Sequence, residues 1–169
     1  MSVHEHRQHA PASVNCGVLT VSDTRTAGDD ASGQRIAALL REHGHRVAVY
    51  RIVKDEPAQI TQALRDAPQE VAAIICNGGT GLAARDSTYE AIRTLLDKEI
   101  TGFGELFRAL SYETIGAAAM LSRATAGVMG DRVVFSLPGS PDAVDLAMTK
   151  LVLPELGHVV GMVRKKSRS

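Results

Sequence analysis

Cysteine is scarce in this sequence, in which only Cys16 and Cys76 occur. Each lies inside an apolar run of the kind that forms a buried strand, so we expect two inert thiols and no disulfide framework. This usage indicates a reducing compartment. The cysteines and histidines also lack the spacing of metal ligands, and no serine is flanked by glycines as a hydrolase nucleophile would be.

Net charge is lacking too, because 19 basic residues are balanced by 19 acidic ones. The chain as a whole therefore has no positive field of the kind that nucleic-acid binding needs, and we expect no nucleic-acid partner. The N-terminus has no apolar stretch that could serve as a signal peptide, and no segment offers about 18 uninterrupted apolar residues. We expect a soluble, cytoplasmic protein without membrane association.

Both ends of the chain are polar. We expect residues 1–12 to be a disordered tail and residues 164–169 to be a solvated basic tail. Three histidines in the first tail have no partner of matching spacing, so they do not predict a metal site: His4, His6 and His9. Residues 13–163 then form a single domain of ordinary size.

Apolar runs alternate with helical patterns along this domain. Residues 14–21 and 71–76 are nearly continuous in apolar side chains, as expected of parallel strands covered on both faces. Residues 47–53 predict a strand with one less buried face, and residues 133–135 predict another. The alternation predicts an α/β fold: a three-layer, doubly wound, mostly parallel sheet with helices on both faces.

Capping signals mark where some helices begin. Pro57 suits the first helical position, with Glu56 as the cap before it. Residues 87–90, Ser-Thr-Tyr-Glu, match a capping box. Asp55 and Asp86 fall just outside these caps, which leaves both carboxylates without a structural role.

Four polar loops follow predicted strands, at residues 22–23, 54–55, 77–86 and 136–141. Ligands of open parallel sheets bind outside the carboxyl ends of the strands, where such loops gather. We therefore expect these loops to form one site, to which Ser22 and Asp23 contribute.

Two of these loops are rich in small residues. The first consists of Asn77, Gly78, Gly79, Thr80 and Gly81, and the second of Pro138, Gly139, Ser140 and Pro141. Glycines allow backbone N–H groups to face phosphate oxygens, although a tight structural turn would also explain a glycine pair. The second loop opens the long last helix, either as an anion site or as an ordinary cap.

Neither loop carries the lysine and hydroxyl pair of a P-loop or the dinucleotide fingerprint, which disfavours a standard NTPase or dehydrogenase. A nucleotide-like or phosphorylated ligand is the prediction. Asp23, Asp55 and Asp86 are candidates to hold Mg²⁺, whose preferred partners are carboxylates and phosphates. Each of the three is equally suited to a turn.

From about Val14 to His158 the chain resembles the molybdopterin adenylyltransferases of molybdenum cofactor biosynthesis, most closely their MoaB branch. The resemblance rests on residues 20–23, 77–81, 85–86, 102–108, 111–113 and 137–141.

This resemblance implies that Mg²⁺ and ATP are used to transfer AMP to the terminal phosphate of molybdopterin, with release of pyrophosphate. It implies a homotrimer or a hexamer of two trimers, with contacts to other enzymes of the pathway. It places Asp55 and Asp86 as the catalytic, magnesium-binding pair. The two glycine loops then bind phosphate and pterin, with Ser140 donating to a phosphate and Glu105 fixing the pterin or the metal.

Two alternatives remain open at this point. Some members of the MoaB branch lack turnover, so the chain could be a non-catalytic molybdopterin-binding paralogue or scaffold, although retention of Asp55 and Asp86 favours an active enzyme. A flavodoxin-like phosphate or flavin binder would share the fold and the strand-end glycines.

Overall fold

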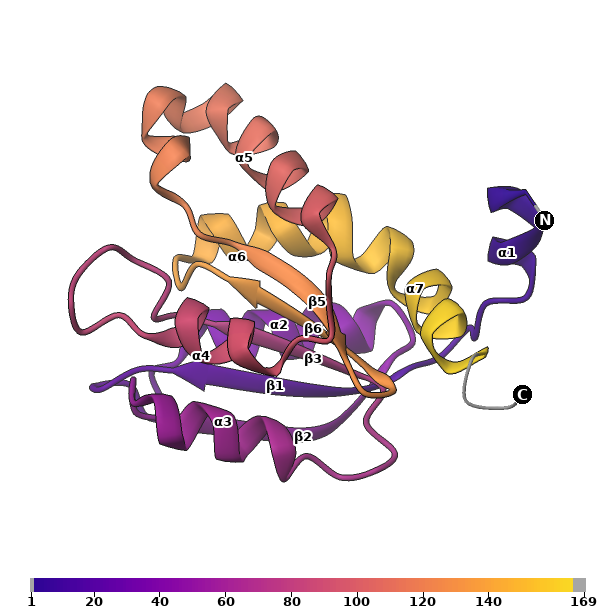
Figure 1. The fold of residues 1–169 in the computed structure, drawn as a ribbon, viewed down its shortest axis with the longest axis horizontal. Coiled ribbons are helices and arrows are strands. Elements are labelled where there is room, and N and C mark those ends of the chain that lie inside the picture. Colours follow the sequence, from indigo (N-terminus) through magenta and orange to yellow (C-terminus); the bar gives the residue numbers. More distant parts are fainter. Residues whose placement is uncertain (1, 166–169) are drawn as a thin grey trace.

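A computed structural model of the chain describes residues 2–165 (Figure 1). The strands are β1 (Asn15–Val21), β2 (Arg46–Val53), β3 (Ala73–Asn77), β4 (Lys98–Glu99), β5 (Thr125–Met129) and β6 (Arg132–Leu137). They form one six-stranded sheet in the order β2-β1-β3-β6-β5-β4. The first four strands in this order are parallel, and β5 and β4 add antiparallel strands at one edge.

Helices cover both faces of the sheet, which confirms the predicted doubly wound α/β class (Figure 1). The helical elements are α1 (Val3–Gln8), α2 (Ala31–Glu42), α3 (Pro57–Arg65), α4 (Thr88–Leu95), α5 (Thr101–Ile115), η1 (Gly116–Leu121), α6 (Pro141–Ala147), η2 (Met148–Val152) and α7 (Leu153–Lys165). One apolar core joins the sheet to α2, α5, α6 and α7. The other joins it to α3 and α4.

Strand β1 shows why two cores form. Successive side chains of a strand point to opposite faces, so Val18 packs in the core with Ile36 of α2, and Leu19 packs in the core with Ile60 of α3. A nearly continuous apolar run satisfies both faces. Strand β2, at the edge, has no fully buried residue, as its mixed sequence predicts.

The carboxyl ends of the parallel strands lie level with one another. Val21 at the end of β1 pairs with Val53 at the end of β2. Asn77 at the end of β3 pairs with Thr20 on one side and Leu137 on the other. The four loops that the sequence singles out therefore leave the same edge of the sheet.

The last helix is long, as predicted, but it contains a π turn at η2, where the N–H of Leu153 donates to the carbonyl of Met148. Pro154 follows directly, and a proline ring clashes with the carbonyl four residues earlier, so the wider turn accommodates it. The stretch Pro141–Lys165 is long and apolar enough to cross a membrane by length and composition. Several of its apolar side chains, including Val144 and Leu156, pack in the core.

The N-terminal tail differs from the prediction of disorder, since Val3–Gln8 forms α1. Ser2 and Glu5 form a capping box that satisfies its first turn, and Arg7 forms an ion pair with Glu155 of α7. Of the predicted basic tail, residues 164 and 165 belong to α7, and residues 166–169 lie outside the described part of the chain.

The two thiols are free and buried in the strands, as predicted. Burial raises the pKa of Cys16 and of Cys76 to about 12. Both thiols therefore stay protonated at about pH 8, and a thiol-specific disulfide reagent should leave them unmodified in the native protein. In guanidinium chloride both should react. Rapid reaction of either thiol in the native protein would contradict this burial.

Candidate functional site

Two glycine loops meet at the carboxyl edge of the sheet. Gly78 and Gly79 have φ angles of 95° and 66°, a backbone conformation that glycine adopts readily, whereas Gly81 does not have a positive φ. The N–H of Gly78 donates to the carbonyl of Leu137 at 3.1 Å. A Cβ placed on Gly139 would lie 3.2 Å from the Cα of Gly78, so a larger residue there would require one of the loops to shift slightly.

Beyond Gly78 the first loop leaves its donors unused. Within residues 2–165, no hydrogen bond has the backbone N–H of Gly79, Thr80, Gly81 or Leu82 as its donor. Backbone N–H groups are usually paired, and a series of free ones makes an anion-binding concavity. The geometry of this loop is therefore suited to phosphate.

A cleft of about 760 Å³ opens beside this loop. Its rim includes four residues of the predicted loops, Thr80, Gly81, Pro138 and Ser140. Its far wall comes from α5, η1 and α6 and carries apolar side chains such as Phe107 and Leu146. A cleft of this volume, with apolar walls and a few polar groups, is typical of a small-molecule site.

Asp55 approaches the same loop from the end of β2 and is 6% exposed. Its Oδ1 accepts hydrogen bonds from the N–H and the hydroxyl of Ser87, at 3.0 and 2.7 Å. Its Oδ2 lies so near Gly79 that a Cβ there would be 2.6 Å away. Asp55 thus has a structural partner that the sequence did not predict.

The predicted capping box at residues 87–90 is wrong for the same reason. Ser87 precedes α4, but its side chain makes no cap hydrogen bond, because the hydroxyl donates to Asp55. Glu90 pairs with Arg123 instead. Glu56 holds the predicted N-cap position of α3, with Pro57 next, but its side chain also makes no cap bond.

Asp86 lies on the other side of the loop and is partly exposed. Its Oδ2 accepts from the N–H of Ala83 at 3.2 Å and lies 2.6 Å from where a Cβ on Gly81 would be. The two predicted catalytic carboxylates therefore lie against residues 79 and 81 of one loop.

Asp23 is occupied by an arginine. Its oxygens accept from Arg85 at 2.9 and 3.0 Å and from the N–H of Asp55 at 3.1 Å. The hydrogen bond from Arg85 lowers the pKa of Asp23.

A magnesium site built on all three aspartates is therefore not formed. Within residues 2–165, no group of three or more His, Cys, Asp and Glu side chains is arranged to hold a metal ion. Asp55 and Asp86 each keep one oxygen that accepts no hydrogen bond from the described residues. Two such carboxylates together with phosphate oxygens fit the usual binding of Mg²⁺.

Asn77 supports the loop from below, since its side chain is fully buried. Its Nδ2 donates to the hydroxyl of Thr20 at 2.9 Å, which donates to Asp30 at 2.5 Å. Asp30 is also buried and accepts from the hydroxyl of Tyr50. The side chain predicted to touch the ligand is thus part of a buried network, and Asp30 is its centre.

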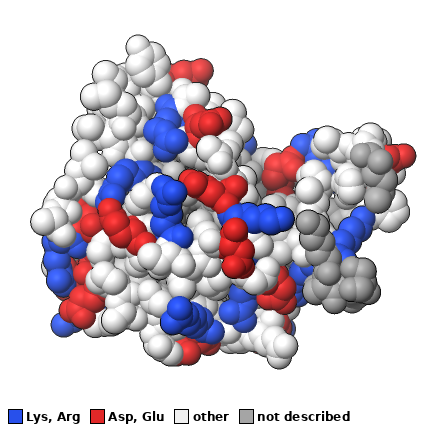
Figure 2. All heavy atoms as spheres, in the orientation of Figure 1, with Lys and Arg blue, Asp and Glu red and all other residues white. Residues whose placement is uncertain are grey.

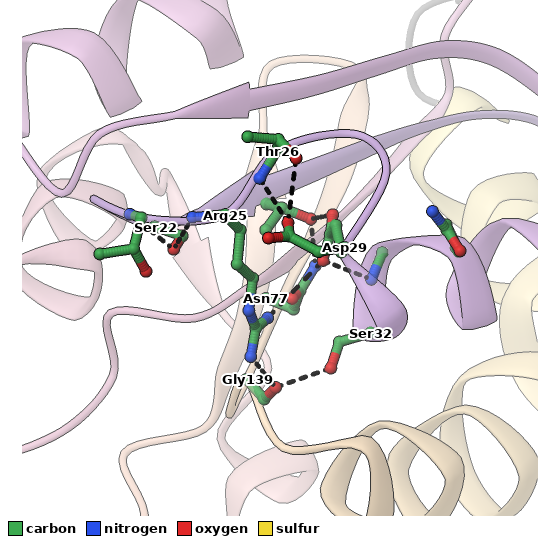
Figure 3. A network of polar contacts seen from close by, with 12 residues as sticks. Ser22, Arg25, Thr26, Asp29, Ser32, Asn77 and Gly139 are labelled. Atoms are coloured by element: carbon green, nitrogen blue, oxygen red, sulfur yellow. Dashed lines mark hydrogen bonds and ion pairs between the residues drawn. The ribbon is translucent and has the colours of Figure 1, made fainter.

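The second loop is held by residues that the sequence did not single out. The carbonyl of Gly139 accepts from Arg25 at 3.1 Å and from Ser32 at 2.7 Å (Figure 3). Ser22 accepts from the N–H groups of residues 24 and 25, which shapes the turn that carries Arg25. Arg25 stands among small and acidic residues in the loop after β1. Its presence there is the sequence signal that could have identified it as a support of the second loop.

Ser140 caps α6 as predicted, with its oxygen accepting from the N–H of Ala143 at 3.3 Å. Pro141 is the first residue of the helix. The hydroxyl hydrogen of Ser140 remains available for donation into the cleft. Glu105 is exposed on α5 and lines neither this cleft nor the loop.

Charge is mixed on the face that Figure 2 draws, where basic and acidic side chains lie side by side without a broad area of one sign.

The chain is similar to known proteins over most of its length. The family model described as "Probable molybdopterin binding domain" matches residues 17–158. The Molybdenum cofactor biosynthesis protein B of Halalkalibacterium halodurans is 55% identical over 168 residues, which cover 98% of this chain and 99% of the relative.

Solved structures show the same similarity. A crystal structure of Molybdenum cofactor biosynthesis protein B has a TM-score of 0.89 and 52% identity, over 93% of this chain and 99% of that one. The tungsten cofactor synthesizing protein MoaB from Pyrococcus furiosus has a TM-score of 0.83 and 41% identity, over 92% and 99% of the chains.

Proposed function

The chain belongs to the molybdopterin-binding domain family of molybdenum cofactor biosynthesis proteins, and on that premise we propose that it transfers AMP from ATP to molybdopterin. The observation that carries the proposal is the run of N–H groups at residues 79–82 that have no partner among residues 2–165. Asp55 and Asp86 flank this loop without lining the large cleft, which the loop itself reaches through Thr80 and Gly81.

In the proposed reaction an oxygen of the terminal phosphate of molybdopterin attacks the α-phosphorus of ATP. A bond forms between them, and the bond from the α-phosphorus to the α,β-bridging oxygen breaks. Pyrophosphate leaves with that electron pair, and the product is adenylyl-molybdopterin. No covalent bond to the protein forms, so the site acts by positioning the phosphates and by stabilising charge on their oxygens.

The residues of the chain divide this work between them. The free N–H groups of the first loop and the hydroxyl of Ser140 bind phosphate oxygens. The cleft walls, with Phe107 and Leu146, bind the ring system of the organic group. Asp55 and Asp86 would hold Mg²⁺, which neutralises phosphate charge when bound. Arg85 keeps Asp23 from adding an uncompensated negative charge beside them.

Purified protein, incubated with molybdopterin, ATP and Mg²⁺, should form adenylyl-molybdopterin. Saturable molybdopterin binding without product would instead identify a non-catalytic paralogue or scaffold. A yellow protein that binds flavin and ignores molybdopterin would identify a flavin binder. Either result would end the proposal.

The proposed enzyme is a cytoplasmic homotrimer or a hexamer that consists of two such trimers. An exposed apolar patch on α5 and η1 supports self-association, since a monomer rarely exposes such a surface. Its members are Leu106, Tyr112, Ile115, Met120 and Leu121, each more than half exposed, and Ile115 and Leu121 also line the cleft.

Replacing Ile115 by glutamate should therefore dissociate the assembly, because it buries a charge in the interface. Light scattering should show the mass falling towards the 18.0 kDa of one chain. Met162→Glu is the control, since Met162 is similarly exposed but lies on α7, away from the patch. An unchanged mass in Ile115→Glu would remove this patch from the interface.

A further inference from the structure

Arg123 lies between η1 and β5, outside every loop that the sequence singles out, yet its side chain reaches the glycine loop. Its Nε donates to the carbonyl of Thr80 at 3.2 Å and its Nη2 to the carbonyl of Gly81 at 2.6 Å. The same guanidinium pairs with Glu90. It also lies 5.0 Å from the centroid of the Tyr89 ring.

These contacts decide where the loop donors point. A peptide unit is planar and trans, so its N–H points opposite to its C=O. The carbonyls of Thr80 and Gly81 belong to the same peptide units as the N–H groups of Gly81 and Leu82. By holding both carbonyls on its own side, Arg123 turns these two N–H groups to the opposite side, where they have no hydrogen-bond partner among residues 2–165.

An arginine suits this position better than a lysine. The guanidinium has five donors in a rigid fork, which lets one side chain bind two carbonyls and a carboxylate at once. Glu90 and the Tyr89 ring, both from α4, fix its plane. The loop is thereby tied to α4 on one side and to the start of β5 on the other.

We propose that Arg123 is a positioning residue for phosphate binding, which acts by orienting the N–H groups of Gly81 and Leu82. The inference rests on the proposed function only in naming phosphate as the ligand. It concerns a side chain that need not touch the ligand itself.

Pyrophosphate is the probe for this proposal. In wild-type protein the amide resonances of Gly81 and Leu82 should shift as pyrophosphate is titrated into a ¹⁵N-labelled sample. Arg123→Ala should weaken pyrophosphate binding about tenfold, because the hydrogen bonds from the charged guanidinium to the loop carbonyls are lost. The shifts of the Gly81 and Leu82 amide resonances on titration should also be abolished. Arg123→Lys should recover part of the affinity, because an ammonium reaches one carbonyl at a time.

Arg93→Ala is the matched control. Arg93 also lies over the Tyr89 ring, at 5.9 Å, and donates to its hydroxyl at 3.0 Å, but it makes no hydrogen bond to the loop. It should bind pyrophosphate as wild type does. Added guanidinium at low millimolar concentration should restore binding to Arg123→Ala and leave Arg93→Ala unchanged.

The inference is overturned if Arg123→Ala binds pyrophosphate like wild type, if Arg93→Ala loses as much affinity, or if the Gly81 and Leu82 amides do not respond in wild type. Adenylylation is measured separately on the same samples. If wild type forms no adenylyl-molybdopterin while the pyrophosphate results hold, the proposed reaction fails and the role of Arg123 stands. In an active enzyme, Arg123→Ala should raise KM for ATP more than it lowers kcat.

Discussion

Replacing Asp86 by asparagine should lower kcat for AMP transfer about 1000-fold, because the variant loses the negative charge that the proposed magnesium site requires. Asparagine has the same shape, and its side-chain oxygen can still accept from the N–H of Ala83. The fold and the assembly should therefore be unchanged. Product formation gives kcat, and circular dichroism and light scattering test the fold and the mass.

Asp97→Asn is the control for this substitution. Asp97 likewise accepts from one backbone N–H, that of Gly130 at 2.7 Å, but it lies between α4 and β4, outside the proposed site. Its variant should keep wild-type activity to within about twofold, as surface changes away from such features usually do. Full activity in Asp86→Asn would remove Asp86 from the mechanism.

Gly79→Ala should lower kcat/KM at least about 100-fold, because misplacement of groups by about 1 Å carries a penalty of that order. Gly79 has a φ of 66°, and a Cβ there would lie 2.6 Å from the Asp55 carboxylate and closer still to the Thr88 hydroxyl. The loop or Asp55 has to move. Positive φ adds a loss of stability of about 1 kcal/mol or more.

Gly130→Ala separates these two effects. Gly130 has a φ of 62°, but nothing lies within 4 Å of a Cβ placed there. Both variants should unfold at lower urea concentration than wild type, and only Gly79→Ala should lose activity. Wild-type turnover by Gly79→Ala would show that the contact between this loop and Asp55 does not matter for the reaction.

Much of the fold could be predicted from residues 14–21 and 71–76, because a strand that is buried on both faces has a nearly continuous apolar sequence. The ends of those runs also placed the four loops, since the parallel strands finish level with one another. The antiparallel strand β4 could not be predicted, because its two residues are exposed and are fixed by pairing with β5.

The site was predicted less completely than the fold. Gly78 and Gly79 adopt a positive φ, as glycines in a tight loop can, and Gly81 does not. Ser87 and Glu90 satisfy a local capping pattern, yet Asp55 and Arg123 compete for them from other parts of the chain. A local sequence pattern does not indicate which residues from distant parts of the chain will form hydrogen bonds or ion pairs with it. The same limit explains why Arg123 left no signal in the sequence.

Isotopic labelling can test whether AMP is the group transferred. With ATP labelled on the α-phosphorus, a single turnover of wild-type enzyme should place the label in adenylyl-molybdopterin. With the label on the γ-phosphorus, the same turnover should place it in pyrophosphate. Label from the γ-phosphorus in the pterin product, or pterin bound with no label transferred from either position, would contradict AMP transfer at this site.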